Sequence, residues 1–302
     1  MLTRATRTCK PIVRSFRRMM NSRTNGAGGK THLEITANDQ RGNILSAATV
    51  EKIENISPKI KRMILKVEDQ RLTFKPGQWV DFYVPGMKEC TGFSMVSTPK
   101  TMAENGILEL AVKQSIHPIT NWVHSDCGAG SQVNIRVGGD YFYSPVSDAD
   151  LSRDILFLAG GVGVNPLYCM WQNLADLYSE RIGLGASGNN PTLGSVHLMF
   201  SAPSVKELIF KDEILKTCEK LPQFSHKFFV TGNLEDDLKT ADCEISNRRI
   251  QSEDIRSVLE NVADKQNLLC FICGPSAMTN SIADLLKHQH IQPDNIRFEK
   301  WF

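Results

Sequence analysis

The segment spanning residues 154–168 constrains the fold more than any other part of the chain. An apolar run of strand length is interrupted by Gly160, Gly161 and Gly163 and continues as a helix-like stretch. Glycines lack the β-carbons that would hold a diphosphate away from the backbone, and free N–H groups at the following helix start can face an anion. Pro166 suits the first helical turn, where its missing N–H is not needed. The spacing is not G-x-G-x-x-G, so an ordinary strand-to-helix turn explains this segment alone equally well.

A second junction of the same kind lies further along the chain. The apolar run 267–273 ends at Gly274 and Pro275, and an amphipathic helix follows. Two such junctions predict an open parallel sheet with a binding crevice at the carboxyl ends of its strands. Ser204 and Ser252 are the N-caps expected for two of the helices. The pattern after Ser147 predicts strands at 155–159, 195–200, 226–231, 268–272 and 295–299, and helices at about 164–179, 204–218, 252–260 and 275–289.

The half of the chain before Ser147 has a different sequence pattern, with short β-rich runs separated by Gly and Pro. Regular short strands of this kind are typical of a small antiparallel barrel. A single short helix is expected at 118–125. The strands are expected at 47–55, 61–68, 78–84, 92–96, 107–113 and 132–137.

The length of 302 residues, 41% of them hydrophobic, is enough for two domains with separate cores. We expect the β-barrel at residues 44–146 and the α/β domain at residues 147–302. Residues 31–43 lack an apolar period and are expected to be a flexible linker.

The first thirty residues have the composition of a mitochondrial transit peptide, which predicts a matrix protein. They are rich in Ser and Thr, and no acidic residue precedes Glu34. The alternative is a disordered basic tail that binds nucleic acid or anionic lipid. The basic residues of this leader are Arg4, Arg7, Lys10, Arg14, Arg17, Arg18, Arg23 and Lys30.

Removal of this leader changes the electrostatic expectation for the protein. Without its eight basic residues, 35 Lys and Arg fall to 27 against 33 Asp and Glu, a formal charge of about −6. A chain with this charge has no electrostatic reason to bind nucleic acid. No apolar run of about 18 residues is present, so no membrane span is expected.

The cysteines and histidines give no support for a metal centre. Cys270 and Cys273 form a C-x-x-C, but they lie in a strand-like run, where an offset of three puts side chains on opposite faces. No spacing typical of an iron–sulfur cluster, haem attachment or a histidine metal site is present. Any redox centre is therefore expected to be an organic cofactor.

Four motifs, in this order, resemble those of the ferredoxin-NADP reductase superfamily. They are residues 75–82 (KPGQWVDF), 92–99 (GFSMVSTP), 159–167 (AGGVGVNPL) and 273–278 (CGPSAM), and the resemblance covers roughly residues 45–302. It implies an antiparallel flavin-binding β-barrel followed by a parallel-sheet, Rossmann-like nucleotide-binding domain. It also implies hydride transfer between nicotinamide C4 and flavin N5.

The resemblance assigns roles to individual residues of these motifs. Ser94 would place a hydroxyl near flavin N5, and Cys273 would line the nicotinamide ribose, while Glu299 would stabilise or relay charge; these three are the expected catalytic residues. Glu299 is equally well explained as an ordinary carboxylate at a strand end. The expected cofactor-binding residues are Gly160, Gly161, Val162, Gly163, Val164, Asn165 and Pro166 at the pyrophosphate, Gly274 and Pro275 at the ribose, and Phe93, Trp301 and Phe302 at the flavin ring. Packing in the barrel core is the alternative for Phe93.

The chain departs from the family pattern where the family holds the flavin phosphates. Thr91 stands where the family carries an arginine, whose fork would bind phosphate by charge-assisted hydrogen bonds. We expect weaker flavin binding unless Lys113 or another base substitutes. Thr120 and Asn121 retain hydrogen-bonding groups at the second phosphate motif, although its glycine is lost. Trp122, an added apolar residue there, is best explained by packing between helix and barrel.

The expected cofactors are therefore NAD and FAD, with FMN as the alternative flavin. NADH is favoured over NADPH because the loop 201–206 has no arginine for a 2′-phosphate. Lys206, or Arg248 with Arg249, could still bind that phosphate.

Two functions follow from these features. The first is a flavin-dependent NAD(P)H oxidoreductase that passes electrons to an unknown acceptor, either a small molecule, a quinone or a redox protein. The second is a non-catalytic, dinucleotide-binding regulatory protein that has lost productive flavin binding, which the missing arginine at Thr91 motivates.

Overall fold

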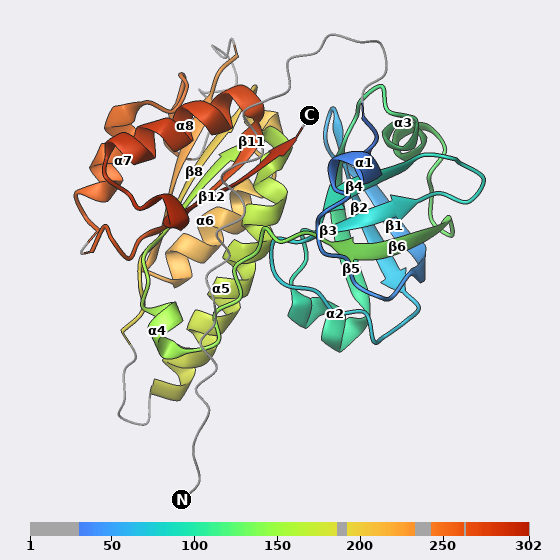
Figure 1. Cartoon of the computed structure of the whole chain (residues 1–302), viewed down its shortest axis with the longest axis horizontal. Helices are drawn as coiled ribbons and strands as arrows, with labels where there is room; N and C mark the ends of the chain where they lie inside the picture. Colours follow the sequence, from blue (N-terminus) through green and yellow to red (C-terminus); the bar gives the residue numbers. More distant parts are fainter. Residues whose placement is uncertain (1–29, 186–191, 233–242, 263, 302) are drawn as a thin grey trace, which may run out of the picture. The chain divides into compact units, whose positions relative to one another are not determined.

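The computed structural model describes residues 30–185, 192–232, 243–262 and 264–301, and Figure 1 shows their elements in order. The proposed transit peptide, residues 1–30, lies outside these ranges except for its last residue. Residues from Thr31 on form one compact unit. This unit contains two six-stranded sheets, each formed by one half of the chain.

The first sheet is antiparallel and curls into a barrel, as predicted. Its strands have the order β4-β3-β6-β1-β2-β5, and a bridge from Met95 to Leu110 joins the two edges. Alternate residues point into one apolar core, which includes Val80, Phe82 and Ile135. The strands are β1 Ser46–Ser57, β2 Ile60–Val67, β3 Trp79–Tyr83, β4 Cys90–Ser94, β5 Ile107–Lys113 and β6 Gln132–Gly138.

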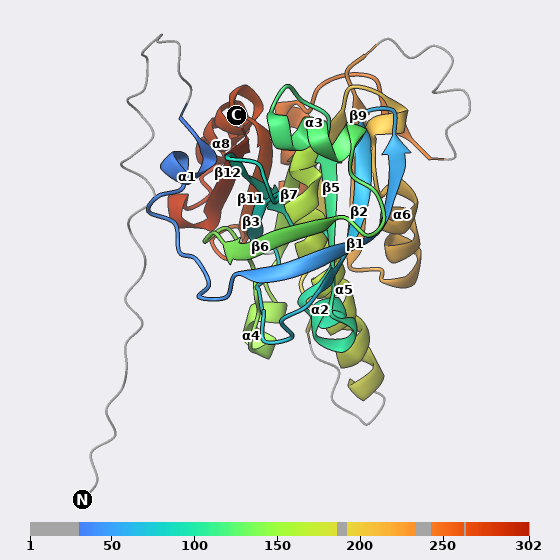
Figure 2. The ribbon, with the colours of Figure 1, turned by 90° about the vertical axis from the view of Figure 1, so that its right-hand side faces the viewer.

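Two helices lie at opposite ends of this barrel (Figure 2). Helix α3, Pro118–Ser125, was predicted, and Trp122 packs from it against the barrel core. Helix α2, Pro99–Asn105, was not predicted, although it has clear end signals. The Thr98 side chain accepts a hydrogen bond from the third residue of the helix, and Gly106 ends it in the left-handed conformation.

The second sheet is parallel, with strand order β10-β9-β8-β7-β11-β12, which confirms the predicted α/β architecture. Helices α5 and α6 pack on one face, and α7 and α8 on the other (Figure 1). The strands are β7 Ile155–Gly160, β8 Val196–Ala202, β9 Phe224–Val230, β10 Ile245–Ser246, β11 Leu269–Pro275 and β12 Ile296–Trp301. The helices are α4 Asp148–Leu151, α5 Val164–Gly185, α6 Lys211–Lys220, α7 Ser252–Leu259 and α8 Ser276–His288.

Both N-cap predictions in this half were wrong. Ser204 precedes only a 3₁₀ turn and forms no side-chain cap bond. Helix α6 begins later, at Lys211, because Phe210 adopts a left-handed conformation with φ 63° and breaks the helical path. In α7 the cap is Gln251, and Ser252 is already the first helical residue.

Residues 31–43 do not form the expected flexible linker. Residues 31–42, which we call the strap, begin with the short helix α1, His32–Ile35, and run beside the end of β6. Gly42 N donates to Val137 O at 2.8 Å. The strap is fixed because its polar side chains find a buried partner, Asp81 of β3, which lies far away in the sequence.

Asp81 is fully buried and accepts hydrogen bonds from three side chains. His32 Nε2 lies 2.9 Å from its Oδ1, and Arg41 Nε lies 2.8 Å and Arg136 Nη2 2.7 Å from its Oδ2. Burial raises the pKa of Asp81, but the bonds from His32, Arg41 and Arg136 outweigh burial and hold this pKa well below its usual value. The strap is therefore attached to the barrel by a charged, desolvated centre.

Helix α5 connects the α/β half directly to the barrel. Asn165 Nδ2 donates to Ala111 O at 2.8 Å, and Gln172 Nε2 donates to Val96 O at 3.0 Å. One apolar core contains both barrel residues such as Val96 and helix residues such as Trp171. The two halves consequently share buried surface.

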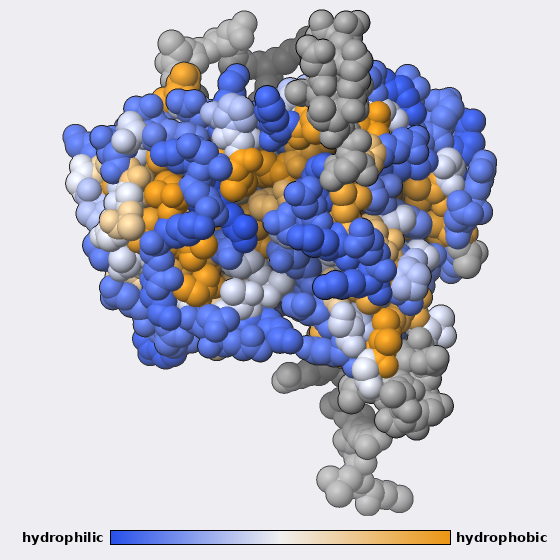
Figure 3. All heavy atoms as spheres, turned by 180° about the vertical axis from the view of Figure 1, so that it is seen from behind, coloured by the Kyte–Doolittle hydropathy of each residue, from blue (hydrophilic) through white to orange (hydrophobic). Residues whose placement is uncertain are grey.

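The face of the molecule in Figure 3 is largely hydrophilic, with apolar side chains in several separate patches. Large apolar side chains that are well exposed include Leu45, Ile116 and Val146. None of the helices in the described part of the chain combines the length and apolar character needed to cross a membrane.

Candidate functional site

The two glycine-containing junctions lie side by side in the structure. Strands β7 and β11 are neighbours, and Ala159 pairs with Cys273. A β-carbon on Gly163 would lie 2.3 Å from Cys273 O, and one on Gly160 would lie 2.5 Å from Met278 Sδ. A β-carbon on Gly274 would approach Gly160 Cα to 3.0 Å. These three glycines therefore allow the two turns to pack closely against each other. The sequence had suggested another reason for glycine here, the close approach of a diphosphate.

Gly161 differs from its neighbours because it faces open space. No atom lies within 4 Å of an added β-carbon, and its φ of +54° is one that glycine adopts most readily. Val162 beside it is half-buried, whereas Val164 and Pro166 are buried. Asn165 is also buried and donates to the barrel, as described above. Of the predicted pyrophosphate turn, the backbone around Gly161 is thus the part placed to meet a ligand.

Glu299 is brought next to Cys273 by the register of β12 on β11. Residues paired directly on neighbouring parallel strands face the same side of the sheet, so their side chains share one surface. Glu299 Oε2 is shielded from solvent and has no hydrogen-bond partner. Burial, reinforced by the nearby carboxylates of Asp140 and Asp39, raises the pKa of Glu299 to about 8. The carboxyl group is therefore largely protonated at neutral pH.

The strap contributes Asp39 to this group of carboxyls. Gly139 N donates to Gln40 O at 3.0 Å, so the strap runs beside the residues that lead to Asp140. Burial and the charge of Asp140 also raise the pKa of Asp39. The charge of Asp140 thus disfavours the ionisation of both Asp39 and Glu299, which come from separate segments.

Tyr141 belongs to the same region and was missed in the sequence. Its hydroxyl is buried without a hydrogen-bond partner, and its ring packs edge-on against Phe271 with centroids 5.8 Å apart. Burial, followed by the charges of Cys273 and Glu299, raises the pKa of Tyr141 well above its usual value. The Gly-Gly-Asp-Tyr stretch at the end of β6 gave no clear signal for it, because the two glycines there make room for the ring of Trp79.

Ser94 ends strand β4, and its hydroxyl is also buried without a hydrogen-bond partner. Phe93 is half-buried and packs edge-on against Phe82, with centroids 5.2 Å apart. Phe93 therefore contacts the barrel core while retaining an exposed part. Ser94, Tyr141 and Glu299 supply three desolvated polar atoms that the described protein does not satisfy.

The residues expected at the flavin phosphates have other partners. Thr120 Oγ1 lies 2.6 Å from Ser115 Oγ and donates to His117 O at 2.8 Å. Lys113 Nζ forms an ion pair with Glu207 Oε2 at 2.9 Å. Asn121 is exposed and Thr91 half-buried, and neither carries a charge. These residues therefore do not gather a cationic phosphate site.

Of the two aromatic residues predicted at the chain end, only the backbone of Trp301 is described. The backbone of Trp301 pairs with Pro275, so β12 ends at the second junction. The Trp301 side chain and all of Phe302 lie outside the described residues. Cys270 and Cys273 belong to different apolar cores on the two faces of the sheet, which confirms the orientation predicted for the C-x-x-C.

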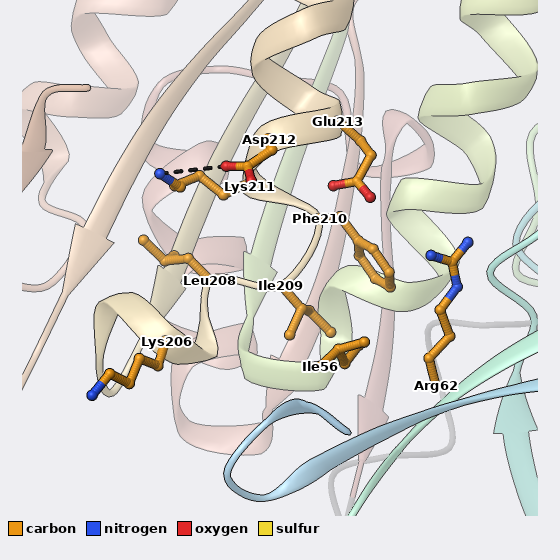
Figure 4. A pocket seen from close by; sticks show the side chains of 9 residues that line it. All are labelled: Ile56, Arg62, Lys206, Leu208, Ile209, Phe210, Lys211, Asp212 and Glu213. Atoms are coloured by element: carbon orange, nitrogen blue, oxygen red, sulfur yellow. Dashed lines mark ion pairs between the residues drawn. The ribbon is translucent and has the colours of Figure 1, made fainter. Parts of the chain in front are cut away.

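A separate cavity of about 270 Å³ lies beside the loop that follows β8 (Figure 4). Its apolar wall includes Ile56, Ile209 and Phe210, and Arg62 and Glu213 lie on one side of it. Lys206 lies on the opposite side in the figure. None of the predicted catalytic residues lines this cavity. Within the described ranges, no group of His, Cys, Asp and Glu gathers as a metal site.

Comparisons with known proteins agree with this arrangement. Residues 157–284 match the oxidoreductase NAD-binding domain. The fold resembles the crystal structure of the cytochrome P450 reductase GcoB from Amycolatopsis, with a TM-score of 0.68 and 21% identity over 85% of this chain and 69% of that one. It also resembles a ferredoxin NADP⁺ reductase from Neisseria gonorrhoeae with bound FAD and NADP, with a TM-score of 0.62 and 16% identity over 85% and 99% of the two chains.

The sequence itself is similar to a set of vertebrate proteins. The oxidoreductase NAD-binding domain-containing protein 1 of Xenopus laevis is 38% identical over 285 residues, which cover 94% of this chain and 88% of the relative. Together with the two-sheet architecture, this similarity shows that the chain belongs to the oxidoreductase NAD-binding domain-containing protein 1 family, with the fold of the ferredoxin-NADP reductases.

Proposed function

We propose that this protein is an NADH-dependent oxidoreductase whose reaction takes place where β7, β11 and β12 end beside the barrel. The observation that carries the proposal is the set of three buried polar atoms without partners, Ser94 Oγ, Tyr141 Oη and Glu299 Oε2. Buried polar groups are nearly always hydrogen-bonded. Of the seven buried side-chain atoms without a partner in the described residues, these three lie on β4, just after β6 and on β12, which makes them candidates to bond a ligand. Cys273 lies directly beside Glu299, and the open backbone of Gly161 lies on the adjoining strand end.

The chain's own residues suit a hydride transfer accompanied by a proton. A bound flavin supplies a two-electron acceptor for the nicotinamide hydride. Glu299, with a pKa of about 8, holds a proton near neutral pH and can give or take it at little cost. The hydroxyl groups of Ser94 and Tyr141 can each donate one hydrogen bond, and both also accept. The site therefore provides uncharged donors and acceptors at pH 7.

The preference for NADH rests on where the arginines lie. A 2′-phosphate is best bound by an arginine fork. Arg248 is already paired with Asp254, with Nη1 2.5 Å from Oδ2 and Nη2 2.8 Å from Oδ1. The loop after β8 contains no arginine, and its Lys206 lines the separate cavity.

The function is tested with the purified full chain, NADH and ferricyanide as an artificial electron acceptor, in the presence of added FMN. We expect NADH oxidation that slows when the transferred hydrogen at nicotinamide C4 is replaced by deuterium. NADPH should react with a lower kcat/KM than NADH. Binding of NADH without any oxidation would instead support the dinucleotide-binding regulatory protein.

We also propose that the protein acts in the mitochondrial matrix. The support is the composition of the first thirty residues, with eight basic and no acidic side chains. The test is import of a reporter fused to residues 1–30 by isolated mitochondria, with dependence on membrane potential. A fusion in which the eight basic residues are changed to glutamine is the matched control and should stay outside.

A further inference from the structure

The arginines of the barrel half are paired with carboxylates, whereas Ser94, Tyr141 and Glu299 each keep a buried polar atom without a partner. Building on the proposed function, we infer that free flavin is the electron acceptor of this protein, bound as a substrate, reduced and released, rather than held as a resident prosthetic group. The inference rests on the partners of the basic side chains and on the start of helix α3.

All four arginines between residues 31 and 146 are already bonded to carboxylates. Arg41 and Arg136 both bind Asp81, and Arg62 binds Glu109 with Nη2 2.5 Å from Oε2. Arg71 pairs with Asp69 at 2.7 Å. An arginine that bound a ligand phosphate would lose its charge-assisted bond to the carboxylate. The net gain in binding free energy would therefore be small. The barrel half therefore offers no arginine fork for a phosphate.

Position 91 is where the superfamily resembled by the sequence carries its arginine, and here it is threonine. Thr91 lies on β4 two residues before Phe93, so both side chains point to the same face of the strand. Lys113, the base that could have compensated, is paired with Glu207 across the two halves of the protein. Thr91 has no charge and Lys113 is already paired, so neither residue offers the fork that a phosphate would need.

The start of helix α3 is also partly capped by the protein. A helix start binds phosphate through its free N–H groups. Pro118 has no N–H, and the N–H of Ile119 donates to His117 Nδ1 at 3.2 Å. The hydroxyl of Thr120 is bonded within the same turn. The first turn of this helix is capped by the protein itself.

The ring end of the site has the opposite character, because its polar atoms are buried and without partners. Ser94 Oγ, Tyr141 Oη and Glu299 Oε2 can bond the nitrogens and carbonyl oxygens of an uncharged heterocycle. Riboflavin, FMN and FAD share this ring and differ only beyond it. A protein that recognises the ring alone binds all three with similar affinity and lets them leave.

The reaction balances without another oxidant. NADH, a flavin and one proton give NAD⁺ and dihydroflavin. The C4–H bond of the nicotinamide breaks, and its hydrogen leaves with both electrons to form the N5–H bond. The proton is taken up at the ring, and Glu299, whose pKa is raised to about 8, is a group of the described site that can hold one at pH 7. NADH is oxidised, the flavin is reduced, and the reduced flavin dissociates.

The experiment compares the affinity of the full chain for riboflavin, FMN and FAD, measured by quenching of flavin fluorescence. We expect dissociation constants that agree within about threefold, since a charge-assisted bond to phosphate would separate them by tenfold or more. Gel filtration should leave the purified protein free of flavin. Each of the three flavins should support repeated NADH oxidation in molar excess over protein.

Thr91→Arg provides a second measurement, because it restores a phosphate-binding fork. It should tighten FMN and FAD by about tenfold and leave riboflavin unchanged. Thr91→Gln, of similar bulk without charge, is the matched control and should change none of the three.

Stoichiometric FAD that survives gel filtration would overturn the inference, as would an affinity for FAD far above that for riboflavin. In both cases NADH-dependent reduction of the retained flavin would leave the proposed function intact. Binding of NADH with no oxidation in the presence of any flavin would overturn both.

Discussion

Glu299 is a carboxyl group that the fold removes from water and surrounds with further carboxyls. Its pKa of about 8 lies above the usual value of 4.5, so the folded protein binds a proton that the unfolded chain has already released. The stability that this proton provides is complete below about pH 4.5 and is lost as the pH rises toward 8. A residue suited to proton transfer is therefore also a source of instability in alkali.

Glu299→Gln tests this reading of the carboxyl group. The variant keeps the shape but has no charge to bury, so its melting temperature should fall less than that of the wild type between pH 5 and 8. Above pH 8 the variant should be the more stable protein. Thermal melts across this pH range measure the effect, and parallel curves for the two proteins would show that Glu299 is ordinarily solvated.

Gly161 and Gly163 lie two residues apart, and glycine is needed at each position for a different structural reason. An alanine at 163 would place its β-carbon 2.3 Å from Cys273 O, a backbone atom that cannot move aside. Gly163→Ala should therefore lower the free energy of unfolding by about 1–3 kcal/mol, and more if the two strand ends separate.

Gly161→Ala is the matched variant at the same turn. It meets no neighbour, so the cost comes from its left-handed backbone and should be about 1–2 kcal/mol. Its methyl group would, however, stand between the backbone and a dinucleotide. We expect a higher Kd for NADH in this variant, measured by titration. An unchanged Kd would place the ligand elsewhere.

At the scale of elements, the polar side chains of the strap are held by one buried carboxylate, Asp81. Asp81→Asn would leave Arg41 and Arg136 without their anion and should cost about 3–5 kcal/mol. Amide exchange of residues 31–42 should accelerate more than exchange in the barrel core. Asp69→Asn, which removes an ion pair at the surface, is the control and should leave the strap protected.

The pH dependence of this attachment has the opposite sign to that of Glu299. The pKa of Asp81 is lowered in the folded protein, so its contribution is present above the unfolded value of 3.8 and is lost only as the pH falls below that. Detachment of the strap at neutral pH in the wild type would contradict this account.

The elements that could be predicted from the sequence are those that carry their own pattern. The six barrel strands and the strands β7, β8, β9, β11 and β12 follow from local periodicity, and α3, α5, α7 and α8 from periodicity and length. The strap was mistaken for a linker because its partner, Asp81, lies about forty residues away and gives no local signal. The late start of α6 has the same cause, since the left-handed Phe210 stacks on Tyr168 of another helix.

The residues of the candidate site also fall into those marked by a local sequence pattern and those positioned by distant partners. Ser94 and Cys273 were predicted from the ordered motifs and Glu299 from the family resemblance at the chain end, and their catalytic roles stay predictions. Tyr141 was missed because its relation to Glu299 depends on how β6 leads toward the parallel sheet. Asn165 was assigned to the cofactor, which stays a prediction, and the bond from its Nδ2 to the barrel could not be foreseen. The residue types at a junction can be read from the sequence, whereas the partner of each side chain depends on the packing of the two halves.

At the scale of the whole molecule, this packing makes the two halves one cooperative system. Asn165 Nδ2 bonds Ala111 O in a buried position, and the apolar core continues from Val96 of the barrel to Trp171 of α5. Asn165→Ala would leave a buried carbonyl without its donor and should cost about 1–3 kcal/mol. Because the core is shared, we expect amide protection to fall equally in β5 and in β7.

The control on the same helix is Ser179→Ala, whose hydroxyl bonds only Ala175 O of its own helix. This variant should leave the protection of both sheets unchanged, because no contact between the halves is altered. If Asn165→Ala instead weakens the α/β half alone, the halves unfold separately, and the buried surface between them contributes little to stability. Equal loss in both sheets would mean that a ligand bound at the β7–β11 junction stabilises the barrel as well, since whatever holds one half folded then holds the other.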